Sequence, residues 1–470
     1  MNKHTIAFLG WANISKGSLQ GGGYNLVASE HAKYLADNGA RVISLQSGTS
    51  YTFRLEKQKI RRKELWNGIE CYSFINSHNR APGLFNLLNK QYQIDDPQQN
   101  KIVCDWLKSY DVCKVFIHSL EGQALSLISD IKRYTGAEVY IICHDHFYIC
   151  PQVKLLRKQR LVCLDYESGS RCESCINTDV DKKYELRQAL RRLWALRTLN
   201  KLINKKNNPE IRKRLKIKPM PLEINKLFLN KLTTNEDGGF YAKRRRAAIE
   251  YLKTADNVFS PSKFITQYLQ KCGLNEKDVR YFKLGLPHLD ALKTVNSSRI
   301  ADGKIIFCCL GSDLYLKGVR FFLEAVRMMN PDIRKRGRFI VKGIINISSF
   351  NEYLNEIAEL EISGEYHVDE ISELSGSYDV GVLPHLWFEN SPITMLEHMA
   401  LGKPVIAAAI GGVVEYIEDK NNGWLFQAGN IQALADLMEE VTSGEIYTDG
   451  TPADSVGSFE NCMNILNGYQ

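Results

Sequence analysis

Short apolar runs alternate with amphipathic stretches along the chain, and this pattern predicts an α/β fold. The apolar runs are three to six residues long and are bounded by glycines or polar residues, as is typical of buried parallel strands. The stretches between them place apolar residues three or four positions apart, which predicts helices that cover the sheets. We expect strands at Thr5–Leu9, Arg41–Leu45, Val115–Ile117, Val139–Cys143, Ile305–Leu310, Phe339–Lys342, around Tyr366–Val368, Val380–Leu383 and Val405–Ile410.

Two segments share the order strand, glycine-rich loop and helix, which predicts two Rossmann-like domains. In the first, Lys16–Gly23 follows the opening strand, but its three consecutive glycines lack the spacing of the dinucleotide-binding fingerprint. In the second, the loop Gly311–Gly318 follows the strand Ile305–Leu310. We therefore expect an N-terminal domain over residues 1–290, a C-terminal domain over 304–441 and a tail over 442–470 that ends in a helix.

The stretch Tyr378–Phe426 carries the densest candidate chemistry. A helix is expected directly after the loop Glu389–Pro392, with Ser391 as its N-cap and Pro392 in its first turn. A helix N-terminus attracts phosphate or diphosphate, because its first N–H groups have no partner within the helix. Glu389 and Glu397 lie eight positions apart, and carboxylates beside such a site are suited to accept hydrogen bonds from sugar hydroxyls.

These motifs resemble the retaining GT-B glycosyltransferases of glycosyltransferase family 4 (glycosyl transferases group 1). The resemblance rests on the pair Glu389 and Glu397, the small-Gly-x-Pro-Val-Ile run at Leu401–Ile406, a Gly-Gly-x-x-Glu motif and an Asn-Gly before an apolar pair. It implies the GT-B architecture, in which two Rossmann-like domains face each other across a cleft and the last helix crosses back to the N-terminal domain. It also implies transfer of a sugar, with retained configuration and without a metal, from a UDP- or GDP-sugar to a saccharide or polyprenyl-linked acceptor. Bacterial cell-surface polysaccharide, such as O-antigen or capsule, is the expected product.

The resemblance assigns roles to individual residues of this sequence. Glu389 would orient the donor sugar, Lys317 would neutralise the diphosphate, His118 would lie near the reacting carbon, and Asp145 would face the acceptor. Ser312 stands where the family has Arg, which removes a positive charge from the expected phosphate site and makes a catalytically weak or inactive partner protein the main alternative. The expected donor-binding residues are Gly22, Gly23, Gly311, Ser312, Lys317, Val368, Asn390, Ser391, Pro392, Ile393 and Glu397.

Composition is that of an ordinary soluble protein of two domains, with 470 residues of which 44% are hydrophobic and 24% charged. No apolar run reaches the length of a membrane span, and the first apolar patch has no cleavage-site pattern, so we expect a cytoplasmic protein. Most of the twelve cysteines should then be reduced. A group of four can form a tetrahedral structural zinc site, with incidental buried thiols or a disulfide as the alternatives: Cys150, Cys163, Cys172 and Cys175.

Basic residues are concentrated in a helical insertion expected over residues 182–250. Residues 182–218 contain fourteen Lys and Arg residues against only two Glu residues, and Lys243–Arg246 is a second basic cluster. An anionic membrane surface, nucleic acid or plain solvent could face this charge. We favour the membrane surface, which would place the protein at the inner face of the plasma membrane. Nucleic acid is disfavoured because no recognition module accompanies the charge.

Overall fold

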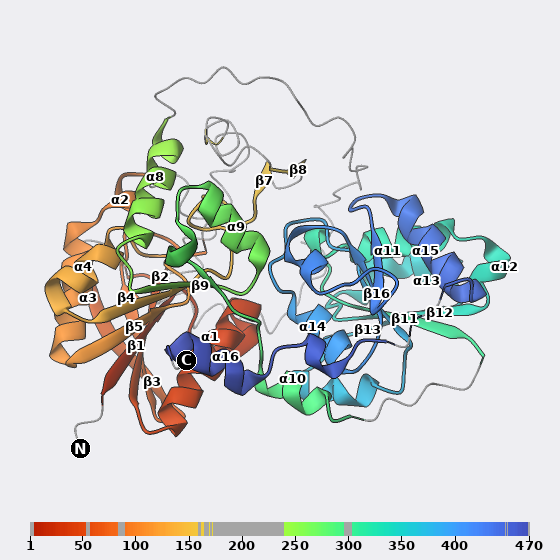
Figure 1. Ribbon diagram of the computed structural model, residues 1–470, viewed down its shortest axis with the longest axis horizontal. Helices are drawn as coiled ribbons and strands as arrows, with labels where there is room; N and C mark the ends of the chain where they lie inside the picture. Colours follow the sequence, from red (N-terminus) through yellow and green to blue (C-terminus); the bar gives the residue numbers. More distant parts are fainter. Residues whose placement is uncertain are drawn as a thin grey trace. The chain divides into compact units, whose positions relative to one another are not determined.

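The computed structural model describes residues 4–52, 57–82, 90–157, 161–163, 169, 172, 239–295, 303–446, 448 and 450–468. The chain divides into two compact units (Figure 1). Unit 1 comprises Met1–Ser260 and Ile265–Arg280, and unit 2 comprises Pro261–Phe264 and Tyr281–Gln470. Each unit is built around its own sheet. None of the helices in the described part of the chain is both long and apolar enough to cross a membrane.

The sheet of unit 1 has eight strands in the order β10-β9-β6-β5-β1-β2-β4-β3. Strand β1 pairs in parallel with β2 on one side and β5 on the other, whereas β3 is antiparallel to β4. The chain therefore proceeds outward from β1 in one direction and from β5 in the other, which makes the β1/β5 edge the switch point of the sheet. The strands are β1 (Thr5–Gly10), β2 (Arg41–Ser50), β3 (Lys59–Trp66), β4 (Ile69–Ile75), β5 (Val112–Ile117), β6 (Glu138–Ile142), β9 (Asn257–Ser260) and β10 (Arg280–Tyr281).

Helices connect the strands of the unit 1 sheet. Helix α1 (Gly23–Asp37) starts directly after the glycine-rich loop and buries Val27, Ala28, His31 and Leu35 along one face. The other described helices of this part of the chain are α2 (Gln91–Ile94), α3 (Pro97–Ser109), α4 (Leu127–Thr135), α8 (Phe240–Leu252) and α9 (Lys263–Lys271), and a short hairpin joins β7 (Leu156–Arg157) to β8 (Leu161–Val162).

The sheet of unit 2 has six parallel strands in the order β13-β12-β11-β14-β15-β16, so its switch point lies between β11 and β14. Its strands are β11 (Ile305–Leu310), β12 (Gly337–Lys342), β13 (Leu360–Ser363), β14 (Val380–Leu383), β15 (Val405–Ala408) and β16 (Gly423–Phe426). Its helices are α10 (Pro287–Leu292), α11 (Val319–Met328), α12 (Pro331–Arg334), α13 (Asn351–Glu356), α14 (Ile393–Ala400), α15 (Ile431–Ser443) and α16 (Phe459–Asn467). Helix α16 packs against α10 within this unit.

The apolar runs locate the buried strands well and the edge strands poorly. Strands β11 and β14 span the predicted residues. The strand expected around Tyr366–Val368 is wrong, because the edge strand β13 lies at Leu360–Ser363 and Val368 opens a 3-10 turn. None of the residues of β13 is fully buried, and its sequence LEIS alternates apolar and polar residues instead of forming an apolar run. The charged edge strand β3, with the sequence KIRRKELW, escaped prediction for the same reason.

Candidate functional site

The loops that follow β11 and β14 meet at the switch point of the unit 2 sheet. There the Lys317 ammonium lies 2.6 Å from Oε1 of Glu389, and the indole N–H of Trp387 donates to the same oxygen at 2.9 Å. The backbone N–H of Leu386 donates to the carbonyl of Leu316 at 3.0 Å and ties the two loops together. The ion pair therefore has a defined place at the carboxyl ends of two neighbouring strands, which is where open α/β sheets bind ligands.

Charge distribution keeps the Glu389 carboxylate ionised although it is buried. Burial alone would raise the pKa of this carboxyl, but the charges of Lys317 and His385 and the hydrogen bonds from Lys317 and Trp387 outweigh it and lower the pKa. His385 lies 3.5 Å from the same oxygen, and its own burial lowers the pKa of its imidazole to about 4. At neutral pH the site thus holds an ammonium, a carboxylate and a neutral imidazole.

Three glycines allow the backbones around this pair to touch. Gly411 has a φ of +64°, and a Cβ there would overlap the carbonyl oxygen of Glu389 in the loop after β14. A Cβ on Gly412 would overlap the carbonyl oxygen of Asn390 in the same loop. Gly318 has a φ of +72°, and a Cβ there would overlap the carbonyl of Pro384. The Gly-Gly motif therefore fixes the backbone that carries Glu389.

The start of α14 differs from expectation. Its N-cap is Pro392, and no side chain caps it. The hydroxyl of Ser391 instead donates to the carbonyl of Pro261 at 2.6 Å and lies 3.1 Å from the hydroxyl of Tyr416. The prediction that Ser391 is the N-cap is wrong, because this hydroxyl anchors the loop to a neighbouring segment. Asn390 and Pro392 are buried beside it, and Ile393 opens the helix half-buried.

The second glutamate, Glu397, lies within α14 and is 3% exposed. Its Oε1 is 3.3 Å from Nε2 of His288, which belongs to α10. Its charge also contributes to a raised pKa of the half-buried Tyr366, for which burial is the largest cause. The two glutamates of the motif therefore face different surroundings, and Glu397 is directed toward α10 and the segment after β13.

The other expected donor residues are spread over the same sheet edge. Gly311 and Ser312 open the loop after β11 and are half-buried, and Val368 lies in the segment between β13 and β14. Arg320 on α11 is held by Asp313, at 3.2 Å, and by the ring of Phe350. Lys317 therefore remains the cation placed at the β11/β14 switch point among the residues that the structure describes.

In unit 1, His118 follows β5 and forms the centre of a row of three histidines. Its Nε2 lies 3.2 Å from Nδ1 of His31, and its Nδ1 lies 2.9 Å from Nε2 of His144. His118 is 2% exposed, and burial followed by the charges of the other two rings lowers its pKa. Both ring nitrogens of His118 are therefore occupied within the protein, and His144 is the half-buried end of the row.

Asp145 and the glycine loop lie near this row. Burial raises the pKa of Asp145 to about 6, although one carboxylate oxygen accepts the backbone N–H of Phe147 at 2.9 Å. Gly22 has a φ of +66° and precedes α1, which begins at Gly23. The ring of Tyr24 in α1 lies 6.0 Å from that of His144. The glycine loop, the histidine row and Asp145 thus share the β1/β5 edge of the unit 1 sheet.

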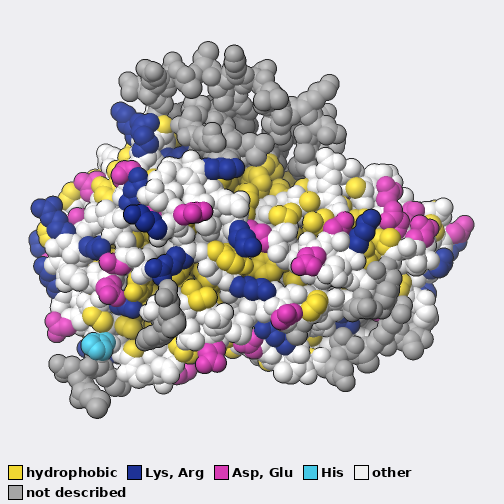
Figure 2. Space-filling model, in the orientation of Figure 1, with side chains coloured by type: hydrophobic (Ala, Val, Ile, Leu, Met, Phe, Trp, Pro, Cys, Tyr) yellow, Lys and Arg dark blue, Asp and Glu magenta, His cyan; other side chains and the backbone are white. Residues whose placement is uncertain are grey.

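The basic cluster Lys243–Arg246 does not form the continuous surface patch that its sequence suggested. Arg244 and Arg245 are buried in α8 and donate to the carbonyls of Phe147 and Ile149, at 3.0 and 3.2 Å. They hold the loop that follows Asp145. Lys and Arg side chains are interspersed with Asp and Glu over the described face that Figure 2 shows. The other basic segment, residues 182–218, lies outside the described residues.

The cysteine group is described in part. Cys150 is buried, Cys163 and Cys172 are half-buried, and Cys175 lies outside the described residues. Among the described side chains, no group of three or more His, Cys, Asp and Glu has an arrangement that could hold a metal ion. A four-cysteine zinc site stays a prediction, because its fourth ligand is outside this set.

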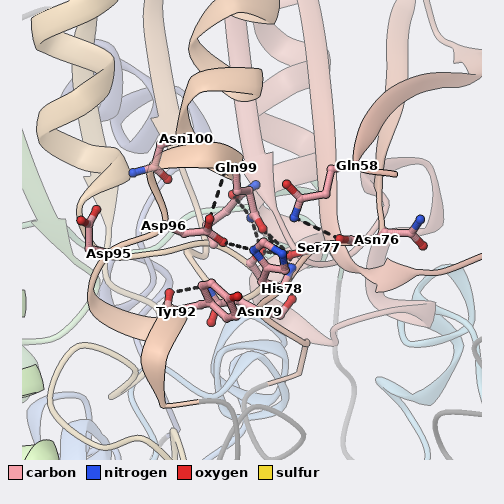
Figure 3. Close-up of polar contacts among 12 residues, drawn as sticks. Gln58, Asn76, Ser77, His78, Asn79, Tyr92, Asp95, Asp96, Gln99 and Asn100 are labelled. Atoms are coloured by element: carbon pink, nitrogen blue, oxygen red, sulfur yellow. Dashed lines mark hydrogen bonds and ion pairs between the residues drawn. The ribbon is translucent and has the colours of Figure 1, made fainter. Parts of the chain in front are cut away.

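A polar network that sequence reasoning missed lies at the same edge of the unit 1 sheet (Figure 3). Buried Asp96, the N-cap of α3, accepts from the ring of His78 at 2.8 Å and from the backbone N–H of Gln99 at 3.2 Å. The ring of His78 stacks on Tyr92 with centroids 4.0 Å apart. Gln99 in turn donates to the carbonyl of Gly122 at 2.9 Å. These bonds hold the loops after β4 and β5 together. The polar residues involved belong to no sequence motif from which the network could have been predicted.

Comparison with known proteins found a family model that matches part of this chain and solved structures with a similar fold. Residues 291–450, which include the Lys317–Glu389 pair, match the family model described as "Glycosyl transferases group 1". The structure of Anabaena HepE in complex with UDP is similar with a TM-score of 0.56 and 13% identity, covering 99% of this chain and 97% of that one. The chain has the GT-B fold.

Curated relatives match this chain over shorter stretches. The amylovoran biosynthesis glycosyltransferase AmsK of Erwinia amylovora is 34% identical over 82 residues, which cover 16% of this chain and 20% of that protein. An uncharacterised glycosyltransferase of Methanocaldococcus jannaschii is 25% identical over 229 residues, 44% of this chain and 57% of that protein. The chain therefore spans less than two thirds of the length of these relatives.

The packing of Gly412 yields a first prediction. We expect Gly412→Ala to lower the free energy of unfolding of unit 2 by about 1–3 kcal/mol, because the added methyl overlaps a backbone oxygen that cannot swing away. Gly376→Ala is the matched control, since a Cβ there meets nothing within 4 Å, and its effect should stay within about 0.5 kcal/mol. Urea unfolding of the two variants measures this, and equal stabilities would contradict the packing described.

Buried histidines yield a second prediction. Burial lowers the pKa of His144 and His398 to about 3 and that of His385 to about 4, against about 6.5 in an unfolded chain. Between pH 6.5 and 4 the unfolded state therefore binds more protons, so stability should fall with pH by up to about 1.4 kcal/mol per pH unit for each histidine. The raised pKa values of Asp145 and Glu415 act in the opposite direction, but burial also lowers the pKa of a fourth histidine, His118, so that histidines outnumber these carboxyls.

Urea midpoints at pH 7.5, 6.5, 5.5 and 4.5 test the pH dependence. His367→Gln is a suitable control, because His367 is exposed and its removal should leave the slope unchanged. A midpoint that stays constant from pH 6.5 to 4.5 would show that these histidines accept protons in the folded protein.

Proposed function

We propose that this protein is a retaining glycosyltransferase that moves a sugar from a UDP- or GDP-sugar to a saccharide or lipid-linked oligosaccharide acceptor. One observation carries the proposal: the Lys317–Glu389 pair, 2.6 Å apart, lies at the β11/β14 switch point within the segment that matches the glycosyltransferase model. A cation and a hydroxyl-binding carboxylate side by side match the two ends of an activated sugar, which are a diphosphate and a polyol.

The donor is bound by unit 2 in this proposal. Lys317 neutralises charge that develops on the departing diphosphate, and the backbone N–H groups of Ser312 and of the start of α14 add to that effect. Glu389 accepts hydrogen bonds from the sugar, and Glu397 accepts them from the ribose. Because protein groups stabilise the leaving group, this mechanism assigns no step to a divalent metal.

The acceptor is bound by unit 1, at the edge that carries His118, His144 and Asp145. Since His31 and His144 occupy both nitrogens of His118, its contribution is to fix the ring of His144 and to shape the wall of the site. Asp145 accepts hydrogen bonds from acceptor hydroxyls. The amylovoran relative supports polysaccharide biosynthesis, and the UDP complex of the Anabaena protein favours a uridine donor. Attachment to an anionic membrane surface through residues 182–218 belongs to the same proposal.

Ser312 favours a second candidate function, a GT-B protein that binds a donor without turning it over. The family's usual arginine would add a second positive charge beside the diphosphate, and serine leaves Lys317 to act with backbone N–H groups. Donor binding without release of the nucleotide would single out this alternative.

Two measurements test the proposed function. Thermal stability is first screened with UDP- and GDP-sugars, since a ligand at 100 times its dissociation constant adds about 2.7 kcal/mol of stability. Nucleotide release from each stabilising donor is then measured with and without saccharide acceptors. The proposal would be contradicted if none of the UDP- or GDP-sugars stabilised the protein.

Lys317→Ala provides the residue-level prediction. We expect turnover to fall roughly ten- to a hundredfold, since one charge-assisted contact contributes about 1.5–3 kcal/mol. Lys335→Ala is the control, because Lys335 is an exposed unit 2 lysine paired with Asp332. Steady-state kinetics with the best donor decides the matter, and unchanged turnover in Lys317→Ala would remove this lysine from the mechanism.

A further inference from the structure

The carboxylate of Glu397 is buried but incompletely satisfied. In the part of the chain that the structure describes, its Oε2 is inaccessible to solvent and has no hydrogen-bond partner. Its Oε1 lies 3.3 Å from Nε2 of His288, close enough for an ion pair but without the geometry of a hydrogen bond. An ionised carboxylate in such a place carries a free-energy cost that hydrogen-bond donors from a ligand would remove.

The described side chains around Glu397 do not donate a hydrogen bond to Oε2. Tyr378 is buried, and its hydroxyl is hydrogen-bonded to Nδ1 of His398 at 2.7 Å. Burial is the main cause of its raised pKa, and the charge of Glu397 contributes to it. Tyr366 lies in the segment that follows β13, and burial followed by the charge of Glu397 raises the pKa of its phenol. Lys317 is paired with Glu389. Among the described residues, His288 is thus the polar side chain that lies within ion-pair distance of Glu397.

His288 is placed by the fold to adjust Glu397. It is the second residue of α10, directly after Pro287, and α10 packs against α14. Its side chain is 15% exposed, against 4% for that of Glu397. An imidazole N–H directed at Oε1 leaves Oε2 and the second lone pair of Oε1 to accept from ligand hydroxyls.

We propose that His288 is a positioning residue that sets how strongly this site discriminates ribose from deoxyribose in the donor nucleotide. The two carboxylate oxygens of Glu397 accept hydrogen bonds from the adjacent 2′ and 3′ hydroxyls, and His288 holds the carboxylate in the orientation that meets both. This inference rests on the proposed function and extends it to a residue outside the motifs of the sequence and outside the matched segment, residues 291–450.

The test compares dissociation constants for UDP and 2′-deoxy-UDP, measured by calorimetry on the full chain. We expect the wild type to bind UDP at least tenfold more tightly than the deoxynucleotide. In His288→Phe, which keeps a ring but removes its N–H, this ratio should fall at least fivefold. His288→Gln, which keeps an N–H donor, should restore most of the ratio. Glu397→Gln gives the reference for a damaged carboxylate.

Controls separate the inference from the function on which it rests. Ala291→Gln, an exposed change on the same helix, should leave the ratio unchanged. If His288→Phe binds UDP with the ratio of the wild type, the role of His288 is overturned while donor binding stands. If the wild type binds neither UDP nor GDP, the proposed function and this inference fall together. If His288→Phe no longer binds either UDP or inorganic pyrophosphate, the substitution has damaged the fold. His288→Gln then decides, and its failure to restore the ratio of the two dissociation constants would overturn the positioning role.

Discussion

A buried carboxylate that must stay charged is the constraint on which the candidate site depends. Glu389 is held ionised by a lysine 2.6 Å away and by an indole N–H. Removing a charge from water is expensive, and it is tolerated where partners are close and well directed. The positions of Lys317 and Glu389 therefore have to be fixed together, and the fold does so by joining their loops through a backbone hydrogen bond and by packing Gly411 and Gly412 directly on the backbone of Glu389 and Asn390.

The sheet topology explains why these two loops meet. Strands β11 and β14 are far apart in sequence but adjacent in the sheet, because the chain goes outward from β11 to β13 before returning to β14 on the other side. The loops after both strands therefore emerge at one edge with nothing crossing between them. Residues that are conspicuous in the sequence, such as Gly423 and Asn422, turn out to support this arrangement: a Cβ on Gly423 would overlap the carbonyl of Val405, and Asn422 bonds the backbone at Glu418 and Tyr416.

The sequence predicted those features that depend on local pattern and missed those that depend on tertiary contact. Continuous apolar runs located β11 and β14 to the residue, because a strand buried on both faces leaves no choice of side chain. The edge strands β3 and β13 were missed or misplaced, since exposed faces admit charge. For the site, Lys317, Glu389 and Glu397 were named from the resemblance of their motifs to a known family, whereas His288, His385 and the His78–Asp96 pair are partners brought in by the fold. Ser391 was given the wrong bond, because a serine before a helix can equally anchor to a distant carbonyl.

The Lys317–Glu389 pair also bears on how a donor with a diphosphate could be accommodated with Ser312 in place of arginine. In the structure the charges of Lys317 and Glu389 cancel, so the site offers little net attraction to an anion at long range. A donor would have to exchange partners at the pair: sugar hydroxyls would satisfy Glu389 while the ammonium turned to the diphosphate. Such an exchange links recognition of the sugar to neutralisation of the leaving group. A nucleotide without a sugar would bind more weakly than the full donor, because use of the ammonium would separate Lys317 from a carboxylate that then stays buried and unpaired. With an arginine at position 312 a nucleotide alone could bind without that separation. With serine at position 312, the free energy needed to release Lys317 from Glu389 would come from the hydrogen bonds between Glu389 and the sugar, and it would therefore depend on which sugar is bound.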